Sequence, residues 1–92
     1  MNQMTTKKKP KQESEIFDLK LYQLWLFNDD VNNFDDVIES LVEVCQHNPL
    51  QAEQCAFIAH IKGKCSVKNG TLKELEPQMV ALFDRGLTVE IK

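Results

Sequence analysis

The feature that most constrains this 92-residue chain is a dense apolar segment that stops abruptly at polar residues. Residues 19–27, LKLYQLWLF, place aliphatic and aromatic side chains at both odd and even positions, which favours a strand covered on more than one side. The segment ends at Asn28, followed by Asp29 and Asp30. These residues are either a turn after the strand or the acceptor side of a site for a cationic group.

A first helix is predicted over residues 34–45. Their apolar side chains recur at intervals of three and four, which is the spacing of one helical face. Asn33 suits the N-cap position. Asp35 and Asp36 fall in the first turn, where the helix dipole favours anions, so these two acids have a structural explanation.

A second helix is predicted between Asn48 and Gly63. Asn48 can cap it, Pro49 suits its first position and Gln51 can complete a capping box. A glycine commonly ends a helix, as Gly63 is expected to do here. One face carries small side chains, with His60 at its edge, and indicates either close packing of another element or a hollow. The small residues are Ala52, Cys55, Ala56 and Ala59.

The last part of the chain predicts a strand, a turn, a helix and a strand. Residues 65–67 alternate as a short strand, and residues 68–70, Lys-Asn-Gly, are typical of a turn. Thr71 and Glu74 can form a capping box, although Pro77 favours a helix start nearer to Leu75. Gly86 should end this helix, and residues 87–91 alternate as a final strand. The helix should turn Leu72, Leu75, Met79, Leu82 and Phe83 toward the core.

The order β-α-α-β-α-β predicts an α+β fold. We expect one small domain over residues 17–92, with a three-stranded antiparallel sheet and helices packed on one face. Residues 1–16 are polar and lysine-rich, and they cannot bury enough apolar surface to offset the entropy of ordering. They are predicted to be a flexible N-terminal extension.

Charge and cysteine content narrow the class of protein. The net charge of −3 combines +4 in residues 1–12 with −7 in residues 13–92, and this acidic body argues against nucleic acid as a partner. The acidic body is compatible with a protonated amine as a partner.

The apolar runs and the cysteines bear on where the protein is found. The chain lacks an apolar run long enough for a membrane helix or a secretory signal. Its three cysteines, spaced by ten residues, match no zinc or redox motif, so we expect a cytoplasmic protein with reduced thiols.

Asn28 and His60 are the candidate ligand-binding pair. They end a predicted strand and a predicted helix, and such ends can meet at one rim of a small sheet. Both side chains can accept hydrogen bonds, which suits an ammonium group. A metal site formed by Asp29, Asp30 and His60 is the alternative, but no tight spacing supports it.

Catalysis has little support in the sequence. Cys55 and His60 are five residues apart, about 500° around a helix, so they point apart and make a poor nucleophile and base pair. The motifs of phosphate-binding loops, zinc proteases and serine hydrolases are missing from the sequence. We therefore expect no enzyme activity, no cofactor and no metal.

Several stretches together resemble the ClpS family of adaptors, which deliver N-end-rule substrates to Clp proteases. They are LWLFNDDVNNFDDVIESLVEVC, then AHIKGKCSV, then a helix followed by GLTVEI. The resemblance covers about residues 20–92. It implies a non-enzymatic adaptor that holds the first residue of a substrate when it is Leu, Phe, Tyr or Trp. The adaptor would pass that substrate to the N-terminal domain of the hexameric ATPase ClpA or ClpC.

The resemblance also implies roles for particular residues. Asn28 and His60 would accept hydrogen bonds from the substrate's free α-amino group, Asp30 would assist through water, and Asp29 would belong to the same acidic corner. The substrate side chain would enter an apolar pocket. That pocket would be lined by Leu26, Phe34, Val37, Ala56, Ala59 and Leu87.

Some positions depart from the family pattern. Ala56 stands where many members have methionine, Ala59 where valine is common, and Phe34 where methionine is common. Asn32 replaces a usual threonine. The pocket is therefore expected to be reshaped, and a β-branched first residue becomes a candidate substrate.

The surface that would dock on the ATPase also differs from the family pattern. Lys73 and Gln78 on the last helix differ from the glutamate and lysine that often face the ATPase in the family. The second hypothesis is therefore a regulatory domain that keeps the fold and binds a Clp ATPase but no longer binds N-degrons.

Overall fold

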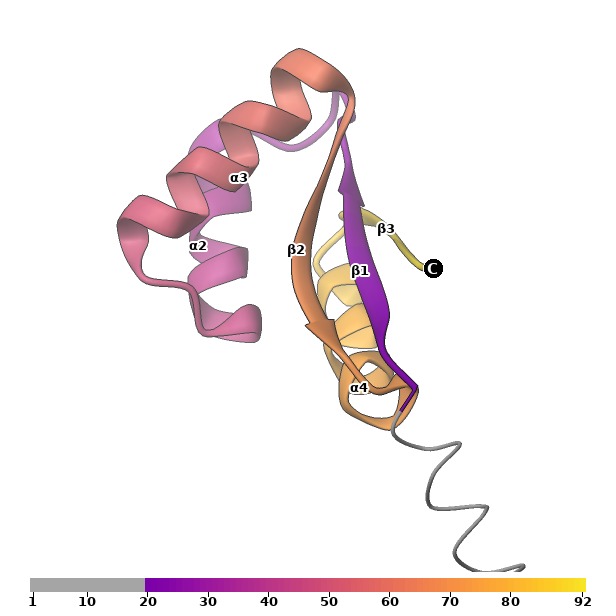
Figure 1. Ribbon diagram of the computed structural model, residues 1–92. Coiled ribbons are helices and arrows are strands. Elements are labelled where there is room, and N and C mark those ends of the chain that lie inside the picture. Colours follow the sequence, from indigo (N-terminus) through magenta and orange to yellow (C-terminus); the bar gives the residue numbers. More distant parts are fainter. Residues whose placement is uncertain (1–19) are drawn as a thin grey trace, which may run out of the picture.

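The computed structural model describes residues 20–92, which fold in the predicted order of strands and helices (Figure 1). The predicted flexible extension, residues 1–16, lies outside this part of the chain. None of the helices within residues 20–92 has the length and apolarity needed to cross a membrane. The elements are β1 (Tyr22–Phe27), α2 (Phe34–Cys45), α3 (Pro49–Lys62), β2 (Lys64–Gly70), α4 (Leu72–Asp84) and β3 (Thr88–Ile91).

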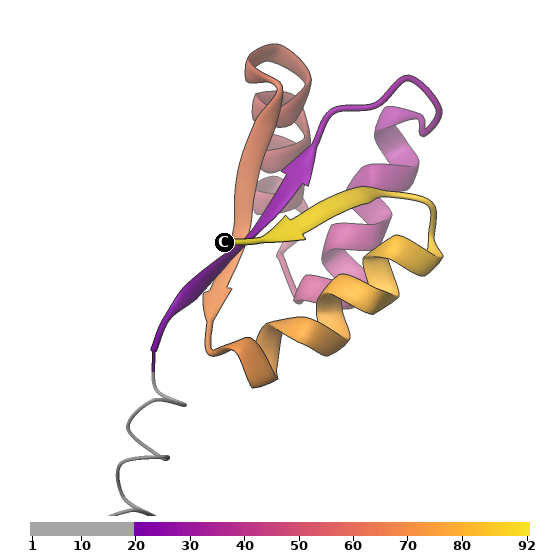
Figure 2. The same cartoon turned by 90° about the vertical axis from the view of Figure 1, so that its right-hand side faces the viewer.

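The sheet has β1 at its centre, with β2 and β3 antiparallel to it on either side. Figures 1 and 2 show the helices on one face of this sheet, as predicted. The register of β1 and β2 shifts between Leu24 and Trp25, which leaves Val67 as an extra residue on β2. The carbonyl of Val67 lies 2.6 Å from Nε2 of the buried His47, so the bulge has a partner in the core.

The two faces of β1 differ in what covers them. Leu24 and Leu26 point toward the helices and are buried. Trp25 and Phe27 lie half-buried on the other face, where the ammonium group of Lys64 is 4.9 Å from the Trp25 ring centroid. The ammonium group of Lys92 lies 6.0 Å from the Phe27 ring. Long lysine side chains, rather than a second layer of helices, therefore shield the aromatic positions predicted to be covered.

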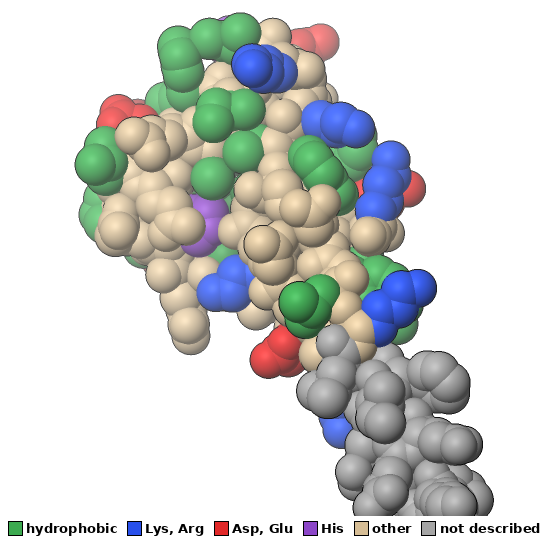
Figure 3. All heavy atoms as spheres, in the orientation of Figure 1, with side chains coloured by type: hydrophobic (Ala, Val, Ile, Leu, Met, Phe, Trp, Pro, Cys, Tyr) green, Lys and Arg blue, Asp and Glu red, His purple; other side chains and the backbone are tan. Residues whose placement is uncertain are grey.

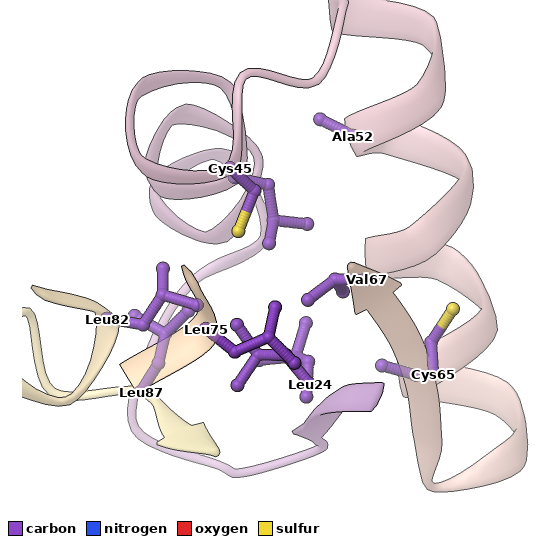
Figure 4. Packing of buried hydrophobic residues seen from close by; sticks show 11 residues of the cluster. Leu24, Cys45, Ala52, Cys65, Val67, Leu75, Leu82 and Leu87 are labelled. Atoms are coloured by element: carbon purple, nitrogen blue, oxygen red, sulfur yellow. The ribbon is translucent and has the colours of Figure 1, made fainter. Parts of the chain in front are cut away.

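The core fills the space between the sheet and the three helices (Figure 4). Its largest fully buried side chains come from a strand and two helices, and each contributes roughly 1.5 to 3 kcal/mol by leaving water. These side chains are Leu24, Leu41, Leu75 and Leu82.

Side-chain caps fix where each helix begins. Asn33 Oδ1 accepts a hydrogen bond from the Asp36 amide at 2.8 Å, and Asn48 Oδ1 does the same for the Gln51 amide. Thr71 caps α4 in a capping box with Glu74, as predicted. These local signals were read correctly because each acts within three residues of the helix start.

One prediction about the region before α4 is wrong, and the structure decides between the two helix starts that the sequence left open. Residues 68–70 form no turn, because β2 continues through Gly70 and pairs with Tyr22 of β1. The helix begins at Leu72 and keeps Pro77 inside it, so the capping box at Thr71 decides the start. The missing amide of Pro77 leaves only the carbonyl of the exposed Lys73 without its helical partner.

The predicted core face of α4 is also partly wrong. Leu75 and Leu82 are fully buried, but Leu72 and Phe83 are 41% and 69% exposed. The two exposed residues lie roughly 60–100° around the helix from the buried pair at 3.6 residues per turn. The apolar pattern of α4 is wider than the face that the sheet covers.

The outer side of α3 is apolar as well. Hydrophobic side chains gather over this helix in the space-filling view (Figure 3). Among the residues of α3, Leu50, Phe57 and Ile61 are all more than half exposed. The inward side carries only alanines among its buried residues. The placement of α3 therefore depends on close backbone packing and on its capped ends at Asn48 and Gly63.

Candidate functional site

The end of β1 and the end of α3 lie at the same rim of the domain. Phe27 pairs with Lys64, and the next amide, that of Asn28, donates a 2.9 Å hydrogen bond to the Gly63 carbonyl. Gly63 caps α3 with φ of 95°, and its own amide donates to the Ala59 carbonyl. Because His60 lies in this last turn, the structure brings it to the same opening as Asn28.

Both residues line a cavity of about 470 Å³. The cavity is bounded by the end of β1, the connection from β1 to α2, the first turn of α2 and the second half of α3. A hollow, one of the two alternatives left open by the sequence, is therefore present beside the small side chains of α3. Its lining residues are Leu26, Phe27, Asn28, Asp29, Asp30, Asn32, Phe34, Val37, Ala56, Ala59 and His60.

The small side chains of α3 account for this hollow. Ala56 and Ala59 are almost completely buried but also line the cavity, so no larger side chain fills the space in front of them. Ala52, one turn earlier, packs fully into the core (Figure 4). The alanine face thus serves both of the purposes considered from the sequence, close packing at one end and a hollow at the other.

The mouth of the cavity is polar and acidic. Asn28, Asp30 and His60 are all exposed there. An amide oxygen, a carboxylate and a neutral imidazole nitrogen are all hydrogen-bond acceptors. Phe34, which is 39% exposed, adds an aromatic ring to the same rim. The arrangement can receive a group that is cationic at one end and apolar at the other.

The side chain of Asp29 has a different role from that of Asp30. Its Oδ1 accepts hydrogen bonds from the backbone amides of Val31 and Asn32, both at 2.9 Å. Partial burial by itself would raise the pKa of Asp29, but the hydrogen bonds from Asn32 and Val31 outweigh it and the pKa is lowered. The carboxylate is therefore charged and adds negative potential to the rim, while its oxygens are used to shape the connection.

Three predicted site residues lie elsewhere. Leu87 does not line the cavity, because it packs in the core beside Leu82 (Figure 4). Its amide donates to the Leu82 carbonyl, which turns the side chain inward.

The two residues predicted to dock on the ATPase differ in exposure. Lys73 is exposed on α4, whereas Gln78 is half-buried with its Oε1 buried and unpaired. Five residues separate these two, about 140° around the helix, so they do not form one patch.

The side chains of residues 20–92 give little support to metal binding or thiol chemistry. Across residues 20–92, no group of three or more His, Cys, Asp or Glu side chains is arranged to hold a metal ion. Burial raises the pKa of Cys45 to about 11, and burial together with neighbouring Cys55 raises that of Cys65 to about 11. Both thiols stay protonated at neutral pH, which suits packing residues rather than nucleophiles.

Two lining residues, Phe27 and Asn32, were missed by the site prediction. Phe27 immediately precedes Asn28, so its position in the sequence could have suggested it. Asn32 was noted only as a departure from the family pattern. Its Nδ2 donates to the Gly86 carbonyl at 2.8 Å, across 54 residues of sequence, and no local pattern could have shown this contact.

Comparison with known proteins gives the family. The family model described as "ATP-dependent Clp protease adaptor protein ClpS" matches residues 18–90. A search of curated proteins found no match. Among solved structures, ClpS2 of Agrobacterium tumefaciens bound to L-phenylalaninamide matches with a TM-score of 0.76 and 23% identity, over 79% of this chain and 95% of that one. The fold is shared, and the chain belongs to the ClpS family of Clp protease adaptors.

Proposed function

We propose that this chain binds the first residue of proteins that begin with a bulky hydrophobic side chain, and delivers those proteins to a Clp protease. The observation that carries the proposal is the shared opening of Asn28, Asp30 and His60 beside a cavity of about 470 Å³ with apolar walls. A protein N-terminus with a large first side chain has the matching chemistry. L-Phenylalaninamide, the ligand of the similar ClpS2 structure, also combines a free amine with an aromatic side chain.

The α-amino group would be held at the mouth of the cavity. Asn28 Oδ1 and a ring nitrogen of His60 would accept two of its three N–H bonds, and Asp30 would assist through water. Asp29 would contribute charge, because its oxygens are already engaged with Val31 and Asn32. Acetylation of the amine would remove both its charge and its donors, so recognition should require a free N-terminus.

The side chain of the first residue would enter the apolar part of the cavity. Burying one large apolar side chain contributes roughly 1.5 to 3 kcal/mol, and each hydrogen bond to a charged group adds a similar amount. After the costs of association, an affinity near micromolar, about −8 kcal/mol, is expected. The walls of this part are Leu26, Phe34, Val37, Ala56 and Ala59.

The ATPase partner is proposed to be the N-terminal domain of ClpA or ClpC, with α4 as the docking helix. Lys73 is exposed on α4 and available for contact. Gln78 is a weaker candidate, because it is half-buried and its Oε1 is enclosed. A cytoplasmic location remains a prediction that goes with this role.

A regulatory domain that binds the ATPase without binding N-degrons is the second candidate. The exposed Leu72, Val80 and Phe83 on α4 would favour it if the cavity proved inert, because they offer an apolar docking surface that is separate from the cavity. The open cavity with its three acceptors favours the first candidate.

Titration calorimetry with one peptide in two forms separates these candidates. A short peptide beginning with Phe should bind with near-micromolar affinity, and the same peptide with an acetylated N-terminus should not. A peptide beginning with Asp serves as a matched control for the side chain. Binding of neither Phe form would support the regulatory domain, and equal binding of both forms would refute recognition through the amine.

A further inference from the structure

The connection between β1 and α2 has almost no apolar anchor of its own. Asn28, Asp30 and Asn33 are exposed, and Val31 is 89% exposed. A six-residue segment without buried apolar side chains must take its shape from hydrogen bonds. In this connection those hydrogen bonds converge on Asp29 and Asn32.

Asp29 closes the connection on itself. Its Oδ1 accepts from the amides of Val31 and Asn32, which makes a tight turn around Asp30. The side-chain Nδ2 of Asn32 lies 3.2 Å from Asp29 Oδ2 and 3.4 Å from Oδ1, so it supplies a further donor to the same carboxylate.

Asn32 also fastens this turn to the rest of the domain. Its Nδ2 donates a 2.8 Å hydrogen bond to the carbonyl of Gly86, between α4 and β3. Gly86 has φ of 87°, and the amides of Gly86 and Leu87 donate to the carbonyls of Phe83 and Leu82. The acceptor is therefore held by its own turn, and Asn32 ties the connection to a fixed point.

We propose that Asn32 is a positioning residue for the amine site, holding Asn28 and Asp30 in place by clamping Asp29 to Gly86. This inference rests on the proposed function. Asn28 is fixed on its other side by the hydrogen bond of its amide to Gly63. Asn32 thus supplies the second fixed end of the segment that carries two of the three acceptors.

Substitution of Asn32 should therefore reduce peptide affinity in a way that differs from substitution of a pocket residue. Without the Asn32 donors, the connection between β1 and α2 would adopt other conformations. The α-amino group of the peptide would then lose well-placed acceptors, whatever the side chain of the peptide's first residue. Affinity should fall by the same factor for every first residue. A change in the apolar pocket would instead alter the preference among first residues.

The sharpest variant is Asn32→Asp, which keeps the shape of the side chain but removes its donors and places a second carboxylate against Asp29. Peptides that begin with Phe and with Leu, otherwise identical, are titrated against the wild type and this variant. Both affinities should fall by about tenfold, because hydrogen bonds to charged groups are among the stronger ones in proteins. The ratio of the two affinities should not change.

Asn69→Asp provides the matched control. Asn69 is exposed on β2, away from the cavity lining, and the substitution makes the same change in charge. Its peptide affinities should stay within about twofold of the wild type. Thermal unfolding of all three proteins checks that the domain is intact.

A measurement without peptide tests the clamp directly. In the Asn32→Asp variant, the heteronuclear ¹⁵N NOE of residues 29–33 should fall, while that of the helices should not change. An unaltered NOE, unaltered affinities, or the loss of only one of the two peptides would each overturn the role given to Asn32. Failure of the wild type to bind any free-amine peptide would instead overturn the proposed function, and this inference with it.

Discussion

The amide of Asn28 donates a 2.9 Å hydrogen bond to the carbonyl of Gly63, and this contact joins the end of β1 to the C-terminus of α3. It places the Asn28 side chain at the opening reached by His60, which lies three residues before Gly63. Two acceptors from elements 32 residues apart in sequence therefore share one rim.

Substitution of either acceptor should weaken binding of a peptide that begins with Phe. Asn28→Ala and His60→Ala should each cost about 1.5 to 3 kcal/mol, roughly a 10- to 150-fold loss of affinity, because each removes a hydrogen bond to a charged amine. Both side chains are exposed, so the thermal midpoint should barely change. Calorimetric titration measures the loss, and an affinity within twofold of the wild type would exclude the substituted residue from the site.

Glutamine in place of His60 should preserve part of the affinity that alanine loses. The amide oxygen of His60→Gln can still accept a hydrogen bond from the amine, whereas His60→Ala has no acceptor at this position. Calorimetric titration of both variants with the Phe peptide compares them at one pH. Equal losses for the two variants would rule out His60 as an acceptor.

The alanines of the cavity should set the choice of first residue. Ala56 and Ala59 line the cavity with small side chains and leave space for a branched side chain. The wild type should therefore bind peptides that begin with Ile or Val as well as Leu. Ala56→Leu should fill part of the space and reduce binding of Trp and Ile peptides more than that of Leu peptides. A competition assay with peptides that differ only in the first residue gives the order. Rejection of both Ile and Val by the wild type would end this expectation.

Acid titration should reveal the hydrogen bonds to Asp29. Because its pKa is lowered in the folded protein, the stabilisation from these bonds is complete above the unfolded pKa and is lost as the pH falls through the folded value. The ¹³C resonance of the Asp29 carboxyl should therefore titrate with a midpoint below the 3.8 of an unperturbed aspartate side chain. The midpoint should rise in Asn32→Asp. A wild-type midpoint at or above 3.8 would be inconsistent with the clamp.

Local signals in the sequence were enough for most of the fold. The caps at Asn33, Asn48 and Thr71 act within a single turn and were read correctly, as was the order of the elements. The turn expected at residues 68–70 failed because pairing with β1 outweighs the turn preference of Lys-Asn-Gly. The exposure of Phe83 could not be predicted, because it depends on how far the sheet extends over α4.

The candidate site was predicted in two ways. Asn28 and His60 could be proposed as a pair because they end a predicted strand and a predicted helix, whereas the pocket residues came from the resemblance to the ClpS family. The prediction failed where contacts span the chain. The position of Leu87 in the core, and the contact between Asn32 and Gly86, depend on the path of the chain between α4 and β3. No spacing in the sequence encodes that path.

The most direct test is an NMR titration of the ¹⁵N-labelled protein with L-phenylalaninamide and, separately, with its N-acetyl derivative. The free amine should shift the side-chain amide of Asn28 and the imidazole of His60 together with the backbone signals of Ala56 and Ala59. The acetylated compound should leave all of them in place. Equal shifts with both compounds, or shifts confined to α4, would contradict a site in which these two side chains hold a free N-terminus beside the cavity.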